Sequence, residues 1–153
     1  METREHDDSA LEEIAQRLRQ TTHASRVTIR GPEAPGEVGT TLLAESSASG
    51  VESMADAPQA GIAEAPTYVF LRTELRPLLQ DDCRDDPLPP RMLTERYGVA
   101  AQMLGPLLHD GNLVGTVSVH EVGQARHWTS EDAAALDTAV GEVWEVWTSR
   151  LPN

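Results

Sequence analysis

Thr116, Ser118 and His120 are three side chains that can hydrogen-bond to a ligand, and they occupy alternate positions of one apolar run. Alternate residues of a β-strand point to the same face of a sheet, so two hydroxyls and an imidazole are expected side by side. We interpret this polar face as the floor of a pocket and the opposite, aliphatic face as part of the core. The alternation places Val114 on the polar face, and Leu113, Gly115, Val117 and Val119 on the aliphatic one.

His120 allows more than one interpretation. On a pocket floor it can donate a hydrogen bond to a ligand, whereas at a strand end it can bond to a neighbouring backbone group. It could also serve an enzyme together with Cys83, but four aspartates within residues 81–86 disfavour the thiolate that such chemistry requires. Those aspartates lack the glycine and spacing of a calcium-binding loop, so we interpret them as a solvated acidic turn and expect no metal site.

The charge balance limits the partners. The chain of 153 residues has a formal net charge of −13, and all 12 basic residues are arginine. Such a chain repels phosphate backbones and anionic lipids, so we expect neither nucleic acid nor a membrane as a partner. A single cysteine excludes an internal disulfide and a multi-cysteine zinc site. The charged start of the chain and the absence of a long apolar run predict a cytoplasmic protein.

Most elements follow from capping signals and hydrophobic periodicity. Residues 66–75 are ambiguous, because the Tyr-Val-Phe run at 68–70 favours a strand whereas the spacing of the apolar residues favours a helix; we prefer the helix. The first half is expected to comprise a charged tail (1–8), a helix (9–22), a strand (24–30), a turn (31–36), a strand (40–45) and a mobile loop (46–61). The second half is expected to comprise a helix (66–75), a short strand (77–80), a helix that carries Leu93 and Tyr97 and ends at Gly98, a hairpin turning at Asp110-Gly111, and a helix from Ser130 to about Arg150.

The last helix carries an apolar stripe that includes Trp144 and Trp147, and Thr129 is its expected N-cap. The two tryptophans could be ordinary core residues or could form the seam of a dimer; we favour the seam because they add much apolar area to one helix. The residues expected at this seam are Leu11, Leu18, Val140, Trp144, Trp147 and Leu151.

The order of elements predicts a single α+β domain over residues 9–151, an antiparallel sheet with both terminal helices on one face. At this level the chain resembles a GAF domain, a relative of PAS domains found in bacterial sensors and regulators. The resemblance spans roughly residues 11–151 and is most specific in the last third. It rests on Gly105-Pro106-Leu107, on residues 110–115 with Val117 and His120, on residues 126–132 leading into Leu136, and on residues 76–82.

The resemblance implies five or six strands, terminal helices that dimerise, and a small-molecule pocket on the other face beneath short helices and loops. Specialised members are disfavoured. The chain has no lysine for the Asn-Lys-Phe-Asp-Glu signature of cyclic-nucleotide binders, no Cys-His pair for a bilin, and too few cysteines for a free methionine sulfoxide reductase. The expected ligand-binding residues are Tyr68, Arg72, Tyr97, Gln102, Leu104, Thr116, Ser118 and His120.

We therefore expect a non-catalytic, dimeric sensor or regulatory domain that binds an unidentified small molecule and acts on a partner protein. One alternative is a ligand-independent dimerisation module, and another is an enzyme that uses Cys83 and His120. Arg72 and Arg96 could clamp an anion or could be ordinary surface residues. The sequence specifies no cofactor.

Overall fold

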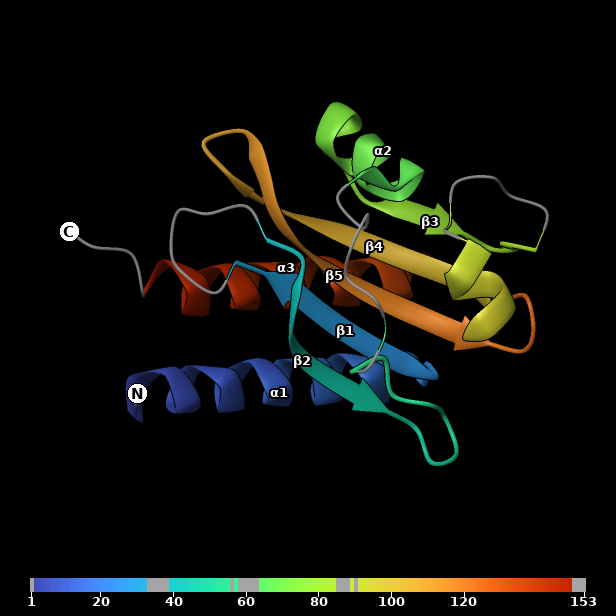
Figure 1. Ribbon diagram of the computed structural model, residues 1–153, viewed down its shortest axis with the longest axis horizontal. Helices are drawn as coiled ribbons and strands as arrows, with labels where there is room; N and C mark the ends of the chain where they lie inside the picture. The colour runs from blue at the N-terminus through green and yellow to red at the C-terminus, as the bar shows by residue number, and fades with distance from the viewer. Residues whose placement is uncertain are drawn as a thin grey trace.

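The computed structural model describes residues 2–32, 39–55, 57, 64–84, 89 and 91–149, and the side chains among them from residue 9 onward. Within this part of the chain, five strands form one antiparallel sheet in the order β2-β1-β5-β4-β3 (Figure 1). The predicted α+β architecture with an antiparallel sheet is confirmed. The strands are β1 (Arg26–Gly31), β2 (Thr41–Ser47), β3 (Leu78–Gln80), β4 (Val99–His109) and β5 (Asn112–Val122).

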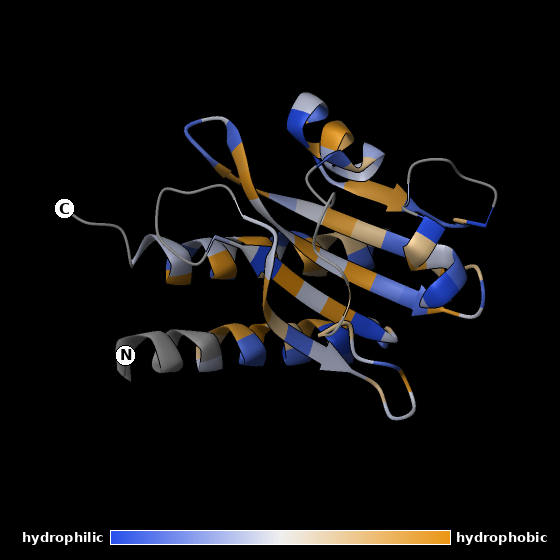
Figure 2. Ribbon diagram, viewed as in Figure 1, coloured by the Kyte–Doolittle hydropathy of each residue, from blue (hydrophilic) through white to orange (hydrophobic). Residues whose placement is uncertain are grey.

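Two long helices, α1 (Glu2–Thr22) and α3 (Ser130–Thr148), lie together behind the sheet in Figure 1. The strands alternate hydrophobic and hydrophilic residues along their length (Figure 2), and their apolar side chains pack against these helices. α3 begins as predicted, because Thr129 Oγ1 accepts from the Asp132 backbone and the Asp132 carboxylate accepts from the Thr129 backbone. α1 begins at Glu2 instead of near Ser9. The prediction of a tail over residues 1–8 is therefore wrong for residues 2–8, which form the first turns of the helix.

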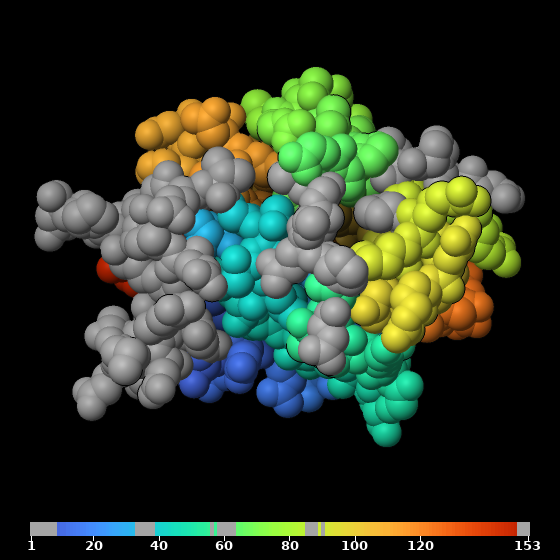
Figure 3. Space-filling view, in the orientation of Figure 1, coloured from blue at the N-terminus to red at the C-terminus, as the bar shows by residue number. Residues whose placement is uncertain are grey.

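The other face of the sheet carries α2 (Pro66–Glu74) and a short π-helical turn, η2 (Met92–Arg96). The predicted helix over 66–75 and the predicted short strand at 77–80 are confirmed. The expected helix around Leu93 is a single π-turn, closed by a bond from the Tyr97 backbone N–H to the Met92 carbonyl, and Gly98 follows with φ +69°. In the space-filling view, α2 lies at the top of this face and η2 at its right (Figure 3).

The β4–β5 hairpin turns at Asp110 (φ +52°) and Gly111 (φ +79°), the two left-handed residues that a tight hairpin requires. One detail of its register differs from the prediction. Leu107 pairs with Gly115 but Leu108 pairs with Leu113, so Val114 is an extra, bulged residue. The bulge reverses the predicted sides: Val114 packs into the core beneath α1 and α3, whereas Leu113 packs with Tyr68 near α2.

Three of the residues expected at a dimer seam are core residues of the single chain. Leu11, Leu18 and Trp147 are 2%, 3% and 5% exposed, because α1, α3 and the sheet cover them. They leave almost no area for a second copy, so their assignment to the seam is corrected. Val140 and Trp144 are partly buried at the edge of this core, and Leu151 lies outside the described residues.

The expected mobile loop over 46–61 is partly structured. Ser46 and Ser47 belong to β2, and Met54 and Ala57 are buried. Residues 56 and 58–61 of this loop lie outside the described part, as do residues 33–36 of the expected turn. None of the helices among the described residues is both long and apolar enough to cross a membrane.

Candidate ligand-binding pocket

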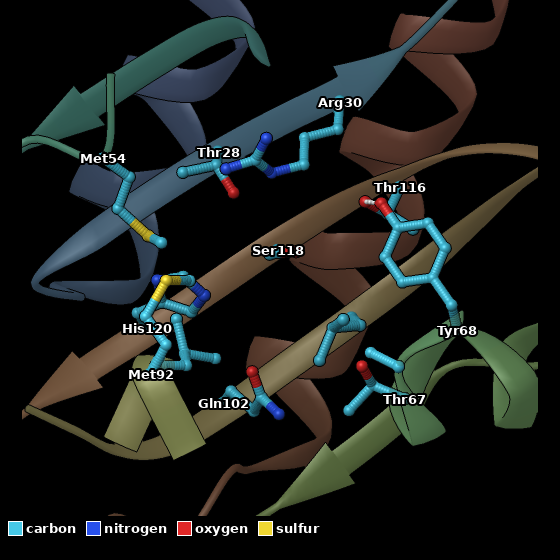
Figure 4. A pocket seen from close by; sticks show the side chains of 13 residues that line it. Thr28, Arg30, Met54, Thr67, Tyr68, Met92, Gln102, Thr116, Ser118 and His120 are labelled. Carbon is cyan, nitrogen blue, oxygen red and sulfur yellow. Dashed lines mark hydrogen bonds between the residues drawn. The ribbon is translucent and has the colours of Figure 1, made fainter. Parts of the chain in front are cut away.

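A cavity of about 60 Å³ lies between the sheet and the elements that cover its polar face (Figure 4). The strands β1, β4 and β5 supply its floor, while α2, η2 and the segment after β2 supply its walls. Its floor is formed by Thr28, Arg30, Gln102, Leu104, Thr116, Ser118 and His120, and its walls by Met54, Ala65, Thr67, Tyr68, Met92 and Leu93.

Cross-strand pairing arranges the floor in rows. One row runs from Thr28 through Ser118 to Leu104, and the neighbouring row runs from Arg26 through His120 and Gln102 to Gln80. Directly opposed residues of adjacent strands lie on the same face within contact distance. The pocket floor is therefore a polar surface that β1, β4 and β5 build together, and its composition depends on register as much as on alternation within one strand.

His120 is held by a buried arginine. Arg26 Nε donates to His120 Nδ1 at 3.1 Å, while Arg26 Nη1 donates to the Glu52 backbone carbonyl at 2.7 Å. Because Nδ1 accepts, the neutral ring carries its proton on Nε2. Burial first, and then the charges of Arg26 and Arg30, lower the pKa of His120 well below its ordinary value. His120 is therefore a neutral residue with a fixed donor.

Arg26 itself is fully buried, and burial lowers its pKa despite the opposing effects of Glu45, Tyr97 and Glu52. Its guanidinium lies 5.8 Å from the centre of the Tyr97 ring, and its Nη2 atom is buried without a hydrogen-bond partner among the described residues. A buried cation with an unpaired N–H is costly. Its Nε bond fixes the orientation of the His120 ring.

Gln102 presents a second unpaired group. Its Nε2 donates to Gln80 Oε1 at 2.7 Å, but its own Oε1 is buried and has no hydrogen-bond partner in the described part of the chain. Leaving such an acceptor unpaired costs about 1–3 kcal/mol. Cys83 Sγ donates to the same Gln80 oxygen at 3.9 Å from outside the cavity. Gln80 and Gln102 thus lie between the thiol and His120 in this row, which removes the geometric basis for the Cys83–His120 pair.

Arg30 brings a positive charge to the part of the cavity floor nearest β2. Its side chain is 6% exposed, its Nη1 donates to the Thr40 carbonyl at 2.9 Å, and burial lowers its pKa. No carboxylate of the described residues lies within ion-pair distance of it. The nearby Glu45 carboxylate instead accepts bonds from Ser53 Oγ and from the Met54 backbone N–H.

Tyr68 joins α2 to the sheet across the cavity. Its hydroxyl lies 3.0 Å from Thr116 Oγ1, inside the protein. Burial raises the pKa of Tyr68 above its ordinary value, opposed by the Thr116 bond and the Arg30 charge. The neutral hydroxyl is therefore a structural link that closes one side of the cavity.

Six of the eight expected ligand-binding residues line this cavity: Tyr68, Gln102, Leu104, Thr116, Ser118 and His120. Their contact with a ligand stays a prediction. Two expectations are wrong in position. Arg72 is exposed on α2 and does not line the cavity, because it follows the buried Leu71 on the outer side of that helix. Tyr97 is buried but does not line the cavity, and the guanidinium groups of Arg96 and Arg26 lie 4.9 Å and 5.8 Å from its ring centre.

Arg96 is not an anion clamp in this arrangement. Its guanidinium forms two bonds of 2.6 Å to the Glu52 carboxylate at the surface. This pair connects η2 to the segment after β2. Because Glu52 also accepts the Arg26 bond through its backbone, the floor and the wall of the cavity are linked at this residue.

Several lining residues were missed in the sequence. Thr28 and Arg30 alternate with Val27 and Ile29 in the predicted strand. The alternation of faces that predicted the position of Ser118 could therefore have predicted theirs. The apolar wall residues carry no comparable signal, because their positions depend on how α2, η2 and the loop pack over the sheet. The missed residues are Thr28, Arg30, Met54, Ala65, Thr67, Met92 and Leu93.

Solved structures share this fold. The chain is similar to the GAF domain of PixJ from Thermosynechococcus elongatus in its blue-light absorbing form (TM-score 0.69, 17% identity, 97% of this chain and 87% of that chain). It is also similar to a type II free methionine-R-sulfoxide reductase from Thermoplasma acidophilum (TM-score 0.70, 13% identity, 97% of both chains). A third similar structure is a domain described as part of a two-component sensor histidine kinase from Sinorhizobium meliloti (TM-score 0.69, 13% identity, 93% and 90%).

These similarities establish the fold. No curated protein sequence matches the chain closely enough to count as a relative. A model of the GAF domain family matches residues 8–145, which comprise most of the elements described above. The chain therefore belongs to the GAF domain family.

Proposed function

We propose that this chain is a non-catalytic sensor domain that binds a small molecule in the cavity beneath α2 and η2. The observation that carries the proposal is the polar floor. There the buried Gln102 acceptor has no hydrogen-bond partner among the described residues, and the buried Arg30 guanidinium forms a bond to a backbone carbonyl but no ion pair with any of them. Similarity in fold to a light-absorbing receptor domain and to a sensor-kinase domain supports a role in signalling. A cytoplasmic location and a regulatory partner protein belong to the same proposal.

The contacts around the cavity suggest how occupancy would be transmitted. Tyr68 ties α2 to β5, and Glu52 ties the segment after β2 to both Arg26 and Arg96. A ligand that displaced either link would alter the strands on which α1 and α3 pack. Such a change shifts the population of two arrangements only if the ligand binds one of them more tightly.

A thermal-shift screen tests the sensor proposal. A ligand that binds only the folded protein must raise the melting temperature, and above its Kd the rise grows with the logarithm of the ligand concentration. The matched variant is Ser118→Leu, which fills the cavity from its floor, and the control is Ser149→Leu at the exposed end of α3. A ligand that shifts the wild type and Ser149→Leu but not Ser118→Leu supports the proposal. If no ligand class shifts the wild type, the sensor proposal fails.

The second candidate is a dimerisation module that needs no ligand. Trp144 favours it, because this partly buried ring forms an aromatic cluster with His109 and Trp147, with ring centres 5.4–5.7 Å apart, at the edge of the core. Sedimentation of Trp144→Glu and Val140→Glu distinguishes the candidates. Loss of a dimer in both variants, with no effect of any ligand on the wild-type dimer, would favour this module over the sensor.

A further inference from the structure

The polar row across the pocket floor is interrupted at its centre. Hydrogen bonds join its outer pairs, Arg26 to His120 at 3.1 Å and Gln102 to Gln80 at 2.7 Å. At the centre, His120 Nε2 and Gln102 Oε1 belong to directly paired residues of β5 and β4, yet they form no hydrogen bond with each other. The described residues supply no other partner to either atom. A fixed donor and a buried acceptor thus face the cavity next to each other.

The chemistry of this gap restricts what can fill it. The filling group must accept a bond from His120 Nε2–H and donate one to Gln102 Oε1. An ammonium group only donates and a carboxylate only accepts, whereas a hydroxyl does both with a single atom. The centre of the row is therefore suited to a hydroxyl group.

Arg30 supplies the second requirement. Its buried guanidinium has a backbone carbonyl and no carboxylate as its partner among the described residues. In Figure 4 its side chain extends back along β1 toward Thr28, the row next to His120. A buried cation is stabilised by an anion, and a guanidinium pairs with a carboxylate through two parallel bonds. The cavity therefore combines a site for a carboxylate with a site for a hydroxyl.

The size of the cavity limits the ligand. A volume of 60 Å³ corresponds to roughly four to six non-hydrogen atoms, at about 10–15 Å³ for each water-sized group. We propose that the cavity binds a small 2-hydroxycarboxylate such as glycolate or lactate, with its hydroxyl between His120 and Gln102 and its carboxylate against Arg30. This inference rests on the proposed function, because it names the ligand class of the same pocket.

The test compares three probes of similar size on the whole chain by calorimetry and thermal shift. Sodium glycolate carries both groups, sodium acetate lacks the hydroxyl, and glycolamide lacks the negative charge. Glycolate is expected to bind at least about tenfold more tightly than either of the others, since each of them leaves one buried polar group unpaired. Equal binding of acetate and glycolate, or of glycolamide and glycolate, would overturn the proposal, and this comparison needs no variant.

Two substitutions assign the contacts. Arg30→Gln removes the buried charge and is expected to make glycolate bind no better than glycolamide. Arg91→Gln removes the same charge from an exposed surface pair and is expected to leave glycolate binding unchanged. An unchanged preference for glycolate in a folded Arg30→Gln variant would place the anion elsewhere and overturn the assignment.

Failure of the ligand class is distinguishable from failure of the pocket. Acetamide and propanol, tested in the same assay, are neutral molecules of similar size. If one of them stabilises the wild type but not Ser118→Leu, and glycolate does not, the hydroxycarboxylate proposal is wrong and the sensor proposal stands. If none of the five probes stabilises the wild type, the hydroxycarboxylate proposal is likewise wrong, and the sensor proposal is decided by the wider screen.

Discussion

Arg26 Nε donates to His120 Nδ1 across neighbouring strands at a site closed to solvent. This bond makes a buried cation the partner of a neutral imidazole. Protonating that imidazole would place two positive charges in contact without water to solvate them. The pKa of His120 is accordingly lowered well below 6.5, first by burial and then by Arg26 and Arg30.

Acid is expected to destabilise the protein through His120. The unfolded chain takes up a proton near the ordinary histidine pKa of about 6.5, whereas the folded chain resists protonation until the pH is far lower. The unfolded state therefore binds more protons in this window. The contribution of neutral His120 is complete above about pH 6.5 and is lost progressively as the pH falls below that value.

Urea unfolding between pH 7.5 and pH 5 measures this effect. The free energy of unfolding should fall more steeply with acid in the wild type than in His120→Asn, which keeps an acceptor for Arg26 but does not titrate. His23→Asn is the matched control: His23 is exposed, and asparagine tolerates its φ of +58°. The control should keep the wild-type slope, and identical slopes in all three proteins would contradict the prediction.

Arg26→Met is expected to raise the pKa of His120. The substitution removes the nearest positive charge, while burial and Arg30 keep the pKa below its ordinary value. Titration of the imidazole by NMR measures the shift. Arg91→Met removes an exposed charge that is paired with Glu95 and is not among the charges that lower the His120 pKa, so it should leave the His120 titration unchanged. An unshifted His120 pKa in Arg26→Met would mean that the Arg26 charge does not contribute to it, and would contradict the prediction.

The elements that the sequence predicts well are those whose signals are local. Asp110-Gly111 specifies its hairpin because both residues tolerate positive φ, and Thr129 with Asp132 closes a capping box within four residues. The alternation of side chains along β5 also predicted that Ser118 and His120 lie on the face of the sheet that carries the cavity. Each of these follows from neighbours in the sequence, without knowledge of the rest of the fold.

The features that escaped prediction depend on partners distant in the sequence. The bulge at Val114 exists because β4 pairs with β5 in two registers. No residue type near Val114 indicates this shift in register. The roles of Trp147 and Leu18 depend on how closely α1 packs against α3, which buried them within one chain. The Gln102 oxygen lacks a hydrogen-bond partner because the Gln102 side chain donates its amide N–H to Gln80 on another strand, and this pairing depends on the register between β3 and β4.

Tyr68→Phe is expected to loosen α2. The variant removes the bond to Thr116, which lies inside the protein, at a cost of about 1–2 kcal/mol in the free energy of unfolding. Hydrogen exchange should accelerate at the α2 amides more than at those of β4 and β5. Tyr97→Phe is the matched control, since the Tyr97 hydroxyl forms no hydrogen bond within the described part of the chain. Equal costs for the two variants would show that the Tyr68 bond contributes nothing.

Gly105 of β4 lies close against α3. A Cβ atom added at this position would lie 2.6 Å from Val140 Cγ2 and 3.3 Å from Leu136, well inside contact distance. Gly105→Ala is therefore expected to destabilise the protein by about 1–3 kcal/mol through overpacking. Gly141→Ala, on α3 with nothing within 4 Å of the added atom, should instead stabilise it by about 0.5–1 kcal/mol.

A second substitution is expected to relieve the overpacking in Gly105→Ala. Val140→Ala removes the methyl groups that the new Cβ would meet, so the double variant Gly105→Ala with Val140→Ala should be more stable than the sum of the single effects predicts. Thermal and urea unfolding of the four proteins gives the coupling free energy. If the effects of the two substitutions simply add, the strand and the helix do not meet at these residues, and the packing of α3 on β4 must be different.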